Sequence, residues 1–308
     1  MCGLYGVLSY GNEVKDMAEI TEALAVESAV RGTDATGIAY NKRGHMTVFK
    51  KSKSAYEMKF SVPKGVNAVM GHTRHATQGT LKYNANNHPF KGICGGKEFA
   101  LAHNGILAND TALRRELRLP STRIETDSYI AVQLLESQKQ LDFKSIKYMA
   151  EKVEGSYSFT ILDNRNNLYI VKGDSPISLL HFTKKKVYVY ASTMSILWKA
   201  LVDTELFSDL KSGEYEEIHV ADGEILKIYS SGQTQRDKFQ FNEFASYGLD
   251  WRTGYCFSYE SRDEYIDDIK SVASYYGYNG EEIDCLLNNG FTPEEVEEML
   301  YCNDCMEV

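Results

Sequence analysis

Cys2 is the first residue of the chain whose side chain can carry out covalent chemistry. Methionine is usually removed when a small residue follows it, so we expect Cys2 to become the first residue of the mature protein. Such a cysteine joins a thiol nucleophile to a free α-amine of pKa about 8, which can accept and return a proton near neutral pH. That pairing is the logic of the N-terminal-nucleophile enzymes. Taken alone, a second-position cysteine is more often an ordinary buried thiol.

A second candidate is Arg74, which lies in a stretch of small and hydroxyl residues at the end of a predicted strand over residues 68–72. A guanidinium group is suited to bidentate capture of an amino acid's α-carboxylate. The commoner fate of an arginine in a loop is to be exposed on the surface.

Two further stretches contain groups that could stabilise or bind a substrate. Asn104-Gly105 follows an apolar strand over residues 99–102, and an asparagine amide beside a glycine N–H can form an oxyanion hole. Asn-Gly is also a common turn. Asp127 precedes a predicted helix, where it could accept a substrate ammonium or act as the helix N-cap.

The order of these motifs resembles the class II glutamine amidotransferases. Their glutaminase domain is shared by glucosamine-6-phosphate synthases, amidophosphoribosyltransferases, asparagine synthetases and glutamate synthases. The resemblance covers about residues 2–229, and any one motif is weak whereas the ordered set is strong. The matching stretches are Cys2-Gly3-Leu4-Tyr5-Gly6, Arg31 to Gly37, His72-Thr73-Arg74, Ala76-Thr77, Gly79, Asn87-His88-Pro89, His103-Asn104-Gly105-Ile106 and Glu125-Thr126-Asp127.

For catalysis, the resemblance implies that Cys2 is the nucleophile and that its α-amine is the general base. It implies that Asn104 and Gly105 form the oxyanion hole. The fold it implies is α+β: a four-layer αββα sandwich of two antiparallel sheets, of the N-terminal-nucleophile hydrolase type. It calls for no cofactor and no metal.

For glutamine binding, the resemblance implies that Arg74 holds the α-carboxylate, that Thr77 lines the pocket and that Asp127 holds the α-ammonium. Two residues depart from the family pattern. His75 stands where close relatives usually have tryptophan or tyrosine, and Gln78 stands where the glucosamine-phosphate branch has histidine. Both flank Arg74, so we expect them to affect closure over the site more than hydrolysis itself.

The pattern of apolar residues agrees with such a fold. Apolar spacing predicts helices over residues 16–29, 127–137 and 143–153. Short apolar runs bounded by turn residues predict strands, and Asp222-Gly223 is a hairpin signal. The predicted strands are 4–9, 37–40, 45–50, 68–72, 99–103, 156–162, 168–172, 178–182, 187–191, 217–220 and 224–229.

The domain organisation follows from composition and charge. We expect a glutaminase domain over residues 2–229, a linker over 230–254 and a small acidic helical module over 255–308. That module has 14 acidic and 2 basic residues, whereas residues 1–254 have 29 acidic and 32 basic. Neither part has a strongly basic stripe, which argues against direct nucleic-acid binding.

The bulk properties are those of a globular protein of 308 residues with 25% charged residues. It has no run of eighteen apolar residues and no signal-peptide pattern, so we expect a cytoplasmic protein without membrane attachment. Its 6 cysteines are then better interpreted as thiols than as disulfides.

The ammonia acceptor is not evident. Residues 230–308 are too few for a synthase domain, and no glycine-rich phosphate loop is present. Three hypotheses remain open. The first, which we favour, is a glutaminase that docks on a separate synthase subunit through residues 255–308. The second is a hydrolase of another γ-glutamyl amide. The third is a non-catalytic regulatory or binding protein.

Four cysteines lie in the acidic module, and four thiols can bind zinc in a tetrahedral site. Their spacing is irregular, so free thiols are the preferred interpretation. The four are Cys256, Cys285, Cys302 and Cys305.

Overall fold

The computed structural model describes residues 2–12, 14–80 and 82–241. Beyond them it describes residues 247–249, 256–258, 266, 269–270, 273, 278–288, 293, 296 and 299–300. The chain divides into two compact units, residues 1–243 and 244–308.

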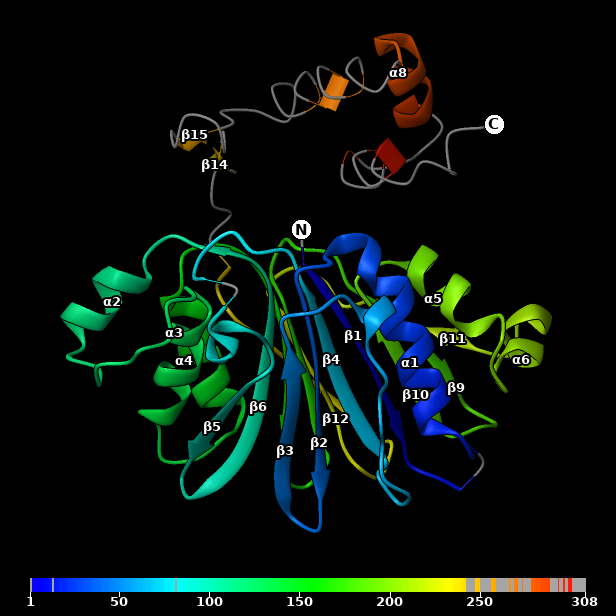
Figure 1. The fold of residues 1–308 in the computed structure, drawn as a ribbon, viewed down its shortest axis with the longest axis horizontal. Coiled ribbons are helices and arrows are strands. Elements are labelled where there is room, and N and C mark those ends of the chain that lie inside the picture. The colour runs from blue at the N-terminus through cyan, green and yellow to red at the C-terminus, as the bar shows by residue number, and fades with distance from the viewer. Residues whose placement is uncertain are drawn as a thin grey trace. The chain divides into compact units, whose positions relative to one another are not determined.

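The first unit has two antiparallel sheets (Figure 1). One sheet has seven strands in the order β11-β9-β10-β1-β4-β2-β3. The central strand β1 is buried along its whole length, as expected for an apolar strand covered on both faces. The strands are β1 (Gly3–Ser9), β2 (Ala35–Lys42), β3 (His45–Lys51), β4 (Ala68–Arg74), β9 (Ser178–Phe182), β10 (Val187–Ala191) and β11 (Glu216–Glu217).

The other sheet has six strands in the order β13-β12-β8-β7-β6-β5. Strand β13 lies within the region predicted to be a linker. Residues Ser230 to Gln233 form a tight turn after β12, in which the Tyr229 N–H donates to the Gln233 carbonyl over 2.8 Å, and the chain then returns to pair with β12. The strands are β5 (Phe90–Cys94), β6 (Lys97–Leu107), β7 (Gly155–Asp163), β8 (Leu168–Lys172), β12 (Glu224–Ile228) and β13 (Thr234–Lys238).

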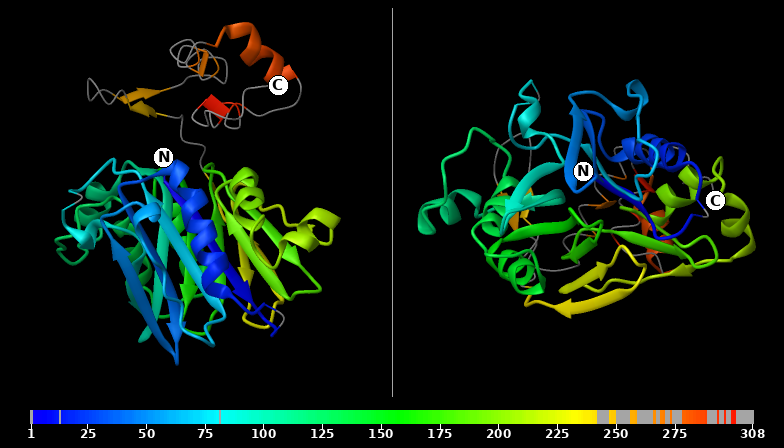
Figure 2. Two further views of the ribbon diagram at one scale, coloured as in Figure 1. Left: turned by 45° about the vertical axis from the view of Figure 1, so that its right-hand side comes forward. Right: turned by 90° about the horizontal axis from the view of Figure 1, so that it is seen from below.

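Helices cover the outer face of each sheet (Figures 1 and 2). Helices α1 (Met17–Ser28), α5 (Met194–Leu201) and α6 (Phe207–Ser212) pack on the seven-stranded sheet through one apolar cluster. Helices α3 (Tyr129–Glu136) and α4 (Phe143–Lys152) pack on the six-stranded sheet, near α2 (Asp110–Glu116). Single 3-10 turns cover Ala29–Arg31, Ala55–Glu57 and Asn84–Asn86. The four-layer αββα sandwich is therefore confirmed.

Local sequence signals set the ends of two of these helices. The Asp16 carboxylate accepts the Glu19 N–H over 2.9 Å and caps α1. Asp142 and Ser145 form a reciprocal capping box at the start of α4. Both helices begin within one residue of the positions predicted from periodicity.

A third apolar cluster fills the space between the two sheets. Its members include several buried alanines, among them Ala39 in β2 of one sheet and Ala100 and Ala102 in β6 of the other. Small side chains let two sheets approach closely, so the thickness of this layer depends on them.

The second unit has a strand pair and a small helical cluster. Strands β14 (Tyr247–Leu249) and β15 (Cys256–Ser258) are antiparallel, and helix α8 spans Gly280–Asn288. The buried apolar cluster of the second unit consists of Ile269, Ala273, Ile283, Val296 and Leu300.

Predictions for the C-terminal region are only partly covered by the described residues. The domain boundaries from sequence stay predictions. Cys285 is exposed on α8, whereas Cys302, Cys305 and the side chain of Cys256 lie outside the described residues. Within the described part of the chain, no helix is long and apolar enough to cross a membrane.

Candidate active site

Cys2 immediately precedes the central strand β1. It lies at the end of the sheet where β4 ends and β2 begins. The register places Gly3 opposite Thr73, and Arg74 opposite Ala35. The Cys2 thiol donates to the carbonyl of His75 over 3.4 Å. The predicted nucleophile therefore lies beside the loop that follows β4.

The Cys2 thiol is held in its protonated form. Burial raises its pKa, Arg74 opposes that effect with its positive charge, and Asp127 adds to it with its negative charge. Three of the predicted site residues thus lie within electrostatic reach of one another. Because the thiol stays protonated at neutral pH, a base must remove its proton when it attacks.

Arg74 is 2% exposed and is bonded to protein groups. Its Nη1 donates to Asn87 Oδ1 over 2.6 Å, and its Nη2 donates to the carbonyls of Gln78 and, over 3.3 Å, Gly79. These bonds use three of the five N–H groups of a guanidinium. Burial lowers the pKa of Arg74, whereas the negative charges of Asp34 and Asp127 raise it.

The loop after β4 is fixed at its start. Asp34 Oδ2 accepts the Ala76 N–H over 2.8 Å and lies 3.8 Å from Nδ1 of His75. Gly32 permits this approach, since a Cβ there would lie 2.4 Å from the Arg74 carbonyl carbon. Thr77 lies exposed further along the same loop.

Asn104 and Gly105 lie near the end of β6, in the other sheet. Asn104 is 2% exposed, and its Nδ2 has no hydrogen-bond partner among the residues that the structure describes. Gly105 has a φ of +129°, and a Cβ there would lie 2.0 Å from the Ser156 carbonyl oxygen. Asn104 thus has a donor available, and Gly105 has a conformation open to glycine alone.

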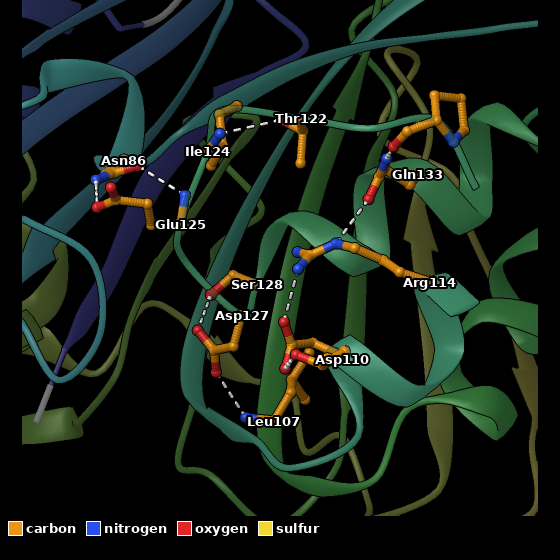
Figure 3. Close-up of polar contacts among 12 residues, drawn as sticks. Asn86, Leu107, Asp110, Arg114, Thr122, Ile124, Glu125, Asp127, Ser128 and Gln133 are labelled. Carbon is orange, nitrogen blue, oxygen red and sulfur yellow. Dashed lines mark hydrogen bonds and ion pairs between the residues drawn. The ribbon is translucent and has the colours of Figure 1, made fainter. Parts of the chain in front are cut away.

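Asp127 does not cap α3, because that N-cap position belongs to Ser128 and makes no side-chain cap bond. Its carboxylate instead accepts the Leu107 N–H over 2.7 Å and the Ser128 hydroxyl over 3.2 Å (Figure 3). The bond to Leu107 fixes Asp127 against the end of β6, two residues beyond Gly105.

Three buried histidines connect the two sheets near this site. His72 Nε2 donates to the His103 carbonyl over 3.0 Å, and the rings of His72 and His88 lie 4.2 Å apart. Burial lowers the pKa of His72 to about 3 and that of His88 well below its usual value, so both imidazoles are neutral. No three His, Cys, Asp or Glu side chains among the described residues are grouped to hold a metal.

Sequence reasoning assigned no role to three buried polar residues around the site, although Arg31 and Asn87 lie in the motifs that carry the resemblance. Arg31 Nε donates to the Cys2 carbonyl over 2.8 Å. Asn86 and Asn87 are both 0% exposed and bond to the segments that hold Asp127 and Arg74. A run of asparagines in a 3-10 turn was the available signal, since asparagine amides often bond to nearby backbone.

Comparisons with known proteins identify relatives of the domain that contains these residues. Residues 72–199 match the family model described as a glutamine amidotransferase domain. The glutamine–fructose-6-phosphate aminotransferase (isomerizing) of Bacillus thuringiensis is 30% identical over 185 residues, covering 58% of this chain and 30% of that protein. That of Listeria monocytogenes is 32% identical over 184 residues, with the same coverage. The chain thus spans less than a third of the length of these relatives.

A solved structure shares the fold. The glutamine phosphoribosylpyrophosphate amidotransferase from B. subtilis superposes with a TM-score of 0.62 at 20% identity, covering 89% of this chain and 58% of that one. From the family match and the shared sandwich together, the chain carries a class II glutamine amidotransferase domain, distantly related to that of the glutamine–fructose-6-phosphate aminotransferases.

Proposed function

We propose that this protein hydrolyses the side-chain amide of glutamine to glutamate and ammonia, with Cys2 as the nucleophile. The observation that carries the proposal is the convergence of three charges or potential charges. The Cys2 thiol lies within electrostatic reach of both the Arg74 guanidinium and the Asp127 carboxylate. A thiol flanked by one positive and one negative group suits a substrate that presents an α-carboxylate and an α-ammonium.

The chemistry starts with the protonated thiol. Once Met1 is removed, the α-amine of Cys2 takes the thiol proton as the sulfur attacks the amide carbon. The amide oxygen becomes an oxyanion, stabilised by Asn104 Nδ2 and the Gly105 N–H. The ammonium of Cys2 then returns its proton to the amide nitrogen, which leaves as ammonia from a γ-glutamyl thioester. Water, activated by the same amine, hydrolyses the thioester and restores the thiol.

The bond from Arg31 to the Cys2 carbonyl supports this assignment. It fixes the main chain of Cys2 through its carbonyl. The distance from the amine to the sulfur is set within the residue itself, so this bond acts on the position of both groups relative to the substrate.

The test is direct. Protein whose mass shows loss of Met1 is incubated with glutamine, and glutamate and ammonia are measured. We expect equimolar release, loss of turnover by a factor of at least about 100 in Cys2→Ser, and the same loss when an alanine is inserted between Met1 and Cys2. Cys94→Ser, which changes a buried thiol in β5, serves as the control and should retain turnover. Processed protein that releases no glutamate contradicts the proposal.

We also propose that the ammonia goes to an acceptor on a separate synthase subunit, which docks through residues 255–308. The 14 acidic residues of this region favour a partner with a basic face. Addition of the cognate synthase should raise glutaminase turnover in the full chain and leave it unchanged in a chain ending at residue 243. Equal stimulation of both chains contradicts this docking site.

A further inference from the structure

The two charged groups of the proposed substrate site come from different parts of the fold. Arg74 ends β4 in the seven-stranded sheet, whereas Asp127 precedes α3, which packs on the six-stranded sheet. The α-carboxylate and α-ammonium of an amino acid sit on one carbon atom, so the site must hold these two side chains at one separation. No single helix or strand does this, and some other segment has to connect them.

Asn87 fixes the guanidinium. Its Oδ1 accepts from Arg74 Nη1 over 2.6 Å, while its Nδ2 donates to Ser52 Oγ over 3.0 Å and to Asn84 Oδ1 over 3.1 Å. The two donor bonds hold the amide in one orientation. Its oxygen therefore has to face Arg74.

Asn86 fixes the segment that leads into Asp127. Its Oδ1 accepts the Glu125 N–H over 2.9 Å, and its Nδ2 donates to Glu125 Oε2 over 2.9 Å, as Figure 3 shows. Its carbonyl accepts the Thr126 hydroxyl over 2.7 Å. Its Nδ2 also donates to the Thr80 carbonyl over 3.1 Å, in the loop that bonds Arg74.

A half-buried cation bonds the backbone of the same segment. Lys50 Nζ donates to the carbonyls of Asn87, of Pro89 over 3.1 Å and of Ala85 over 3.4 Å. The segment is thus fixed by its backbone as well as by its side chains. Because the segment is held rigidly, the position of the Arg74 guanidinium at one end is fixed relative to the Glu125-Thr126 segment at the other.

We propose that Asn86 and Asn87 act as a spacer that sets the separation between the Arg74 guanidinium and the Asp127 carboxylate. They are positioning residues, since each acts through a neighbouring group. The spacer makes the site selective for amides that carry both an α-carboxylate and an α-ammonium. This inference rests on the proposed function, because it takes glutamine as the ligand.

The two asparagines predict opposite patterns with truncated substrates. 4-Carbamoylbutanoate is glutamine without the α-ammonium, and 4-aminobutanamide is glutamine without the α-carboxylate. Binding is measured by calorimetry in the Cys2→Ala background, which prevents turnover. In Asn87→Leu we expect the Kd for glutamine to rise by a factor of about 10 to 100 and the Kd for 4-aminobutanamide to stay the same. In Asn86→Ala we also expect the Kd for glutamine to rise, but here the Kd for 4-carbamoylbutanoate should stay the same.

Three further variants separate positioning from simple structural support. Asn87→Asp keeps an acceptor for Arg74 and should restore most of the affinity for glutamine. Glu125→Ala removes half of the pair with Asn86 at an exposed side chain, so it folds even if Asn86→Ala does not, and it should reproduce the Asn86 pattern. Asn167→Ala removes two side-chain bonds in the turn between β7 and β8, the one that Nδ2 donates to Asp163 and the one that Oδ1 accepts from the Ser230 N–H, and should leave all three Kd values unchanged.

Two results overturn the spacer. One is a variant that weakens glutamine and both truncated ligands by the same factor, which indicates general loss of order. The other is the absence of glutamine binding to the Cys2→Ala protein. Selective binding without turnover in the processed Cys2 protein supports the spacer and contradicts only the proposed hydrolysis.

Discussion

Gly105→Ala tests the part of the site that depends most directly on backbone geometry. Gly105 lies in β6 opposite Tyr157 of β7, with a φ of +129°. A methyl group there would lie 2.0 Å from the carbonyl oxygen of Ser156, which is itself part of β7. The neighbour is backbone inside a sheet, so relief of the overlap requires the two strands to separate locally.

The magnitude has two contributions. Placing a residue with a Cβ in this region of φ costs about 1–3 kcal/mol. Forcing an extra methyl group into a well-packed site costs about 1–3 kcal/mol more. The free energy of unfolding should therefore fall by about 2–6 kcal/mol, a large fraction of the 5–15 kcal/mol that is usual for a domain.

Gly96→Ala is the matched control. Gly96 has a φ of +75°, and a Cβ there would meet no atom within 4 Å. Gly96→Ala should therefore lower the free energy of unfolding only by the conformational cost, about 1–2 kcal/mol. The difference between the two variants isolates the clash with β7.

The assay is urea denaturation of both variants beside the parent protein, followed by glutaminase kinetics on folded material. Because the Gly105 N–H is a proposed oxyanion donor, its displacement should lower kcat by a factor of about 100 to 1,000, whereas Gly96→Ala should retain kcat. Equal destabilisation by the two substitutions refutes the argument from the β6–β7 contact. Retained kcat in folded Gly105→Ala refutes the oxyanion role.

Three other predictions follow from the same geometry. Because His72 has a folded pKa of about 3 against an ordinary 6.5, its stabilising contribution is present above pH 6.5 and is lost as the pH falls toward 3. Between pH 7 and 5 it loses about 2 kcal/mol in urea denaturation; His72→Gln should reduce this pH dependence by that amount, and the exposed control His45→Gln should not. Arg31→Met should lower kcat about 10-fold with little change in KM, because the lost bond acts on Cys2 and not on substrate; a rise in KM alone contradicts that role. A chain ending at residue 243 should hydrolyse glutamine alone within about 2-fold of the full chain, since the first unit has its own apolar clusters, and loss of cooperative thermal unfolding would show that the unit needs the second.

Periodicity and turn signals predicted most of the strands and helices, and the resemblance to the class II glutamine amidotransferases predicted the four-layer sandwich. The helices α1, α3 and α4 begin close to their predicted positions because their apolar spacing acts locally, and capping residues such as Asp142 also set the start of α1 and α4. Strand β13 was missed because all five of its residues are exposed and polar, so its pairing with β12 leaves no alternating pattern.

The proposed site shows where local reasoning ends. The motifs around Cys2, Arg74 and Asn104 predict a role for each residue. No motif predicts how far its residue lies from the others. The bond from Asp127 to Leu107 joins residues 20 positions apart, and that from Arg31 to Cys2 joins residues 29 positions apart. A helix N-cap was an equal expectation for Asp127 because only the folded chain brings the end of β6 to its carboxylate.

The alanines between the two sheets have a consequence for the chemistry. The proposed nucleophile is attached to one sheet and the proposed oxyanion donors to the other, so the reacting distance is set by how far apart the sheets stand. Ala102 lies in that layer, two residues before Asn104. The distance between Cys2 and the oxyanion donors therefore depends on the thickness of a hydrocarbon layer, whereas we assign the separation of Arg74 and Asp127 to Asn86 and Asn87. We therefore expect substitutions in this layer to change the proposed glutaminase activity even where they do not contact the proposed substrate.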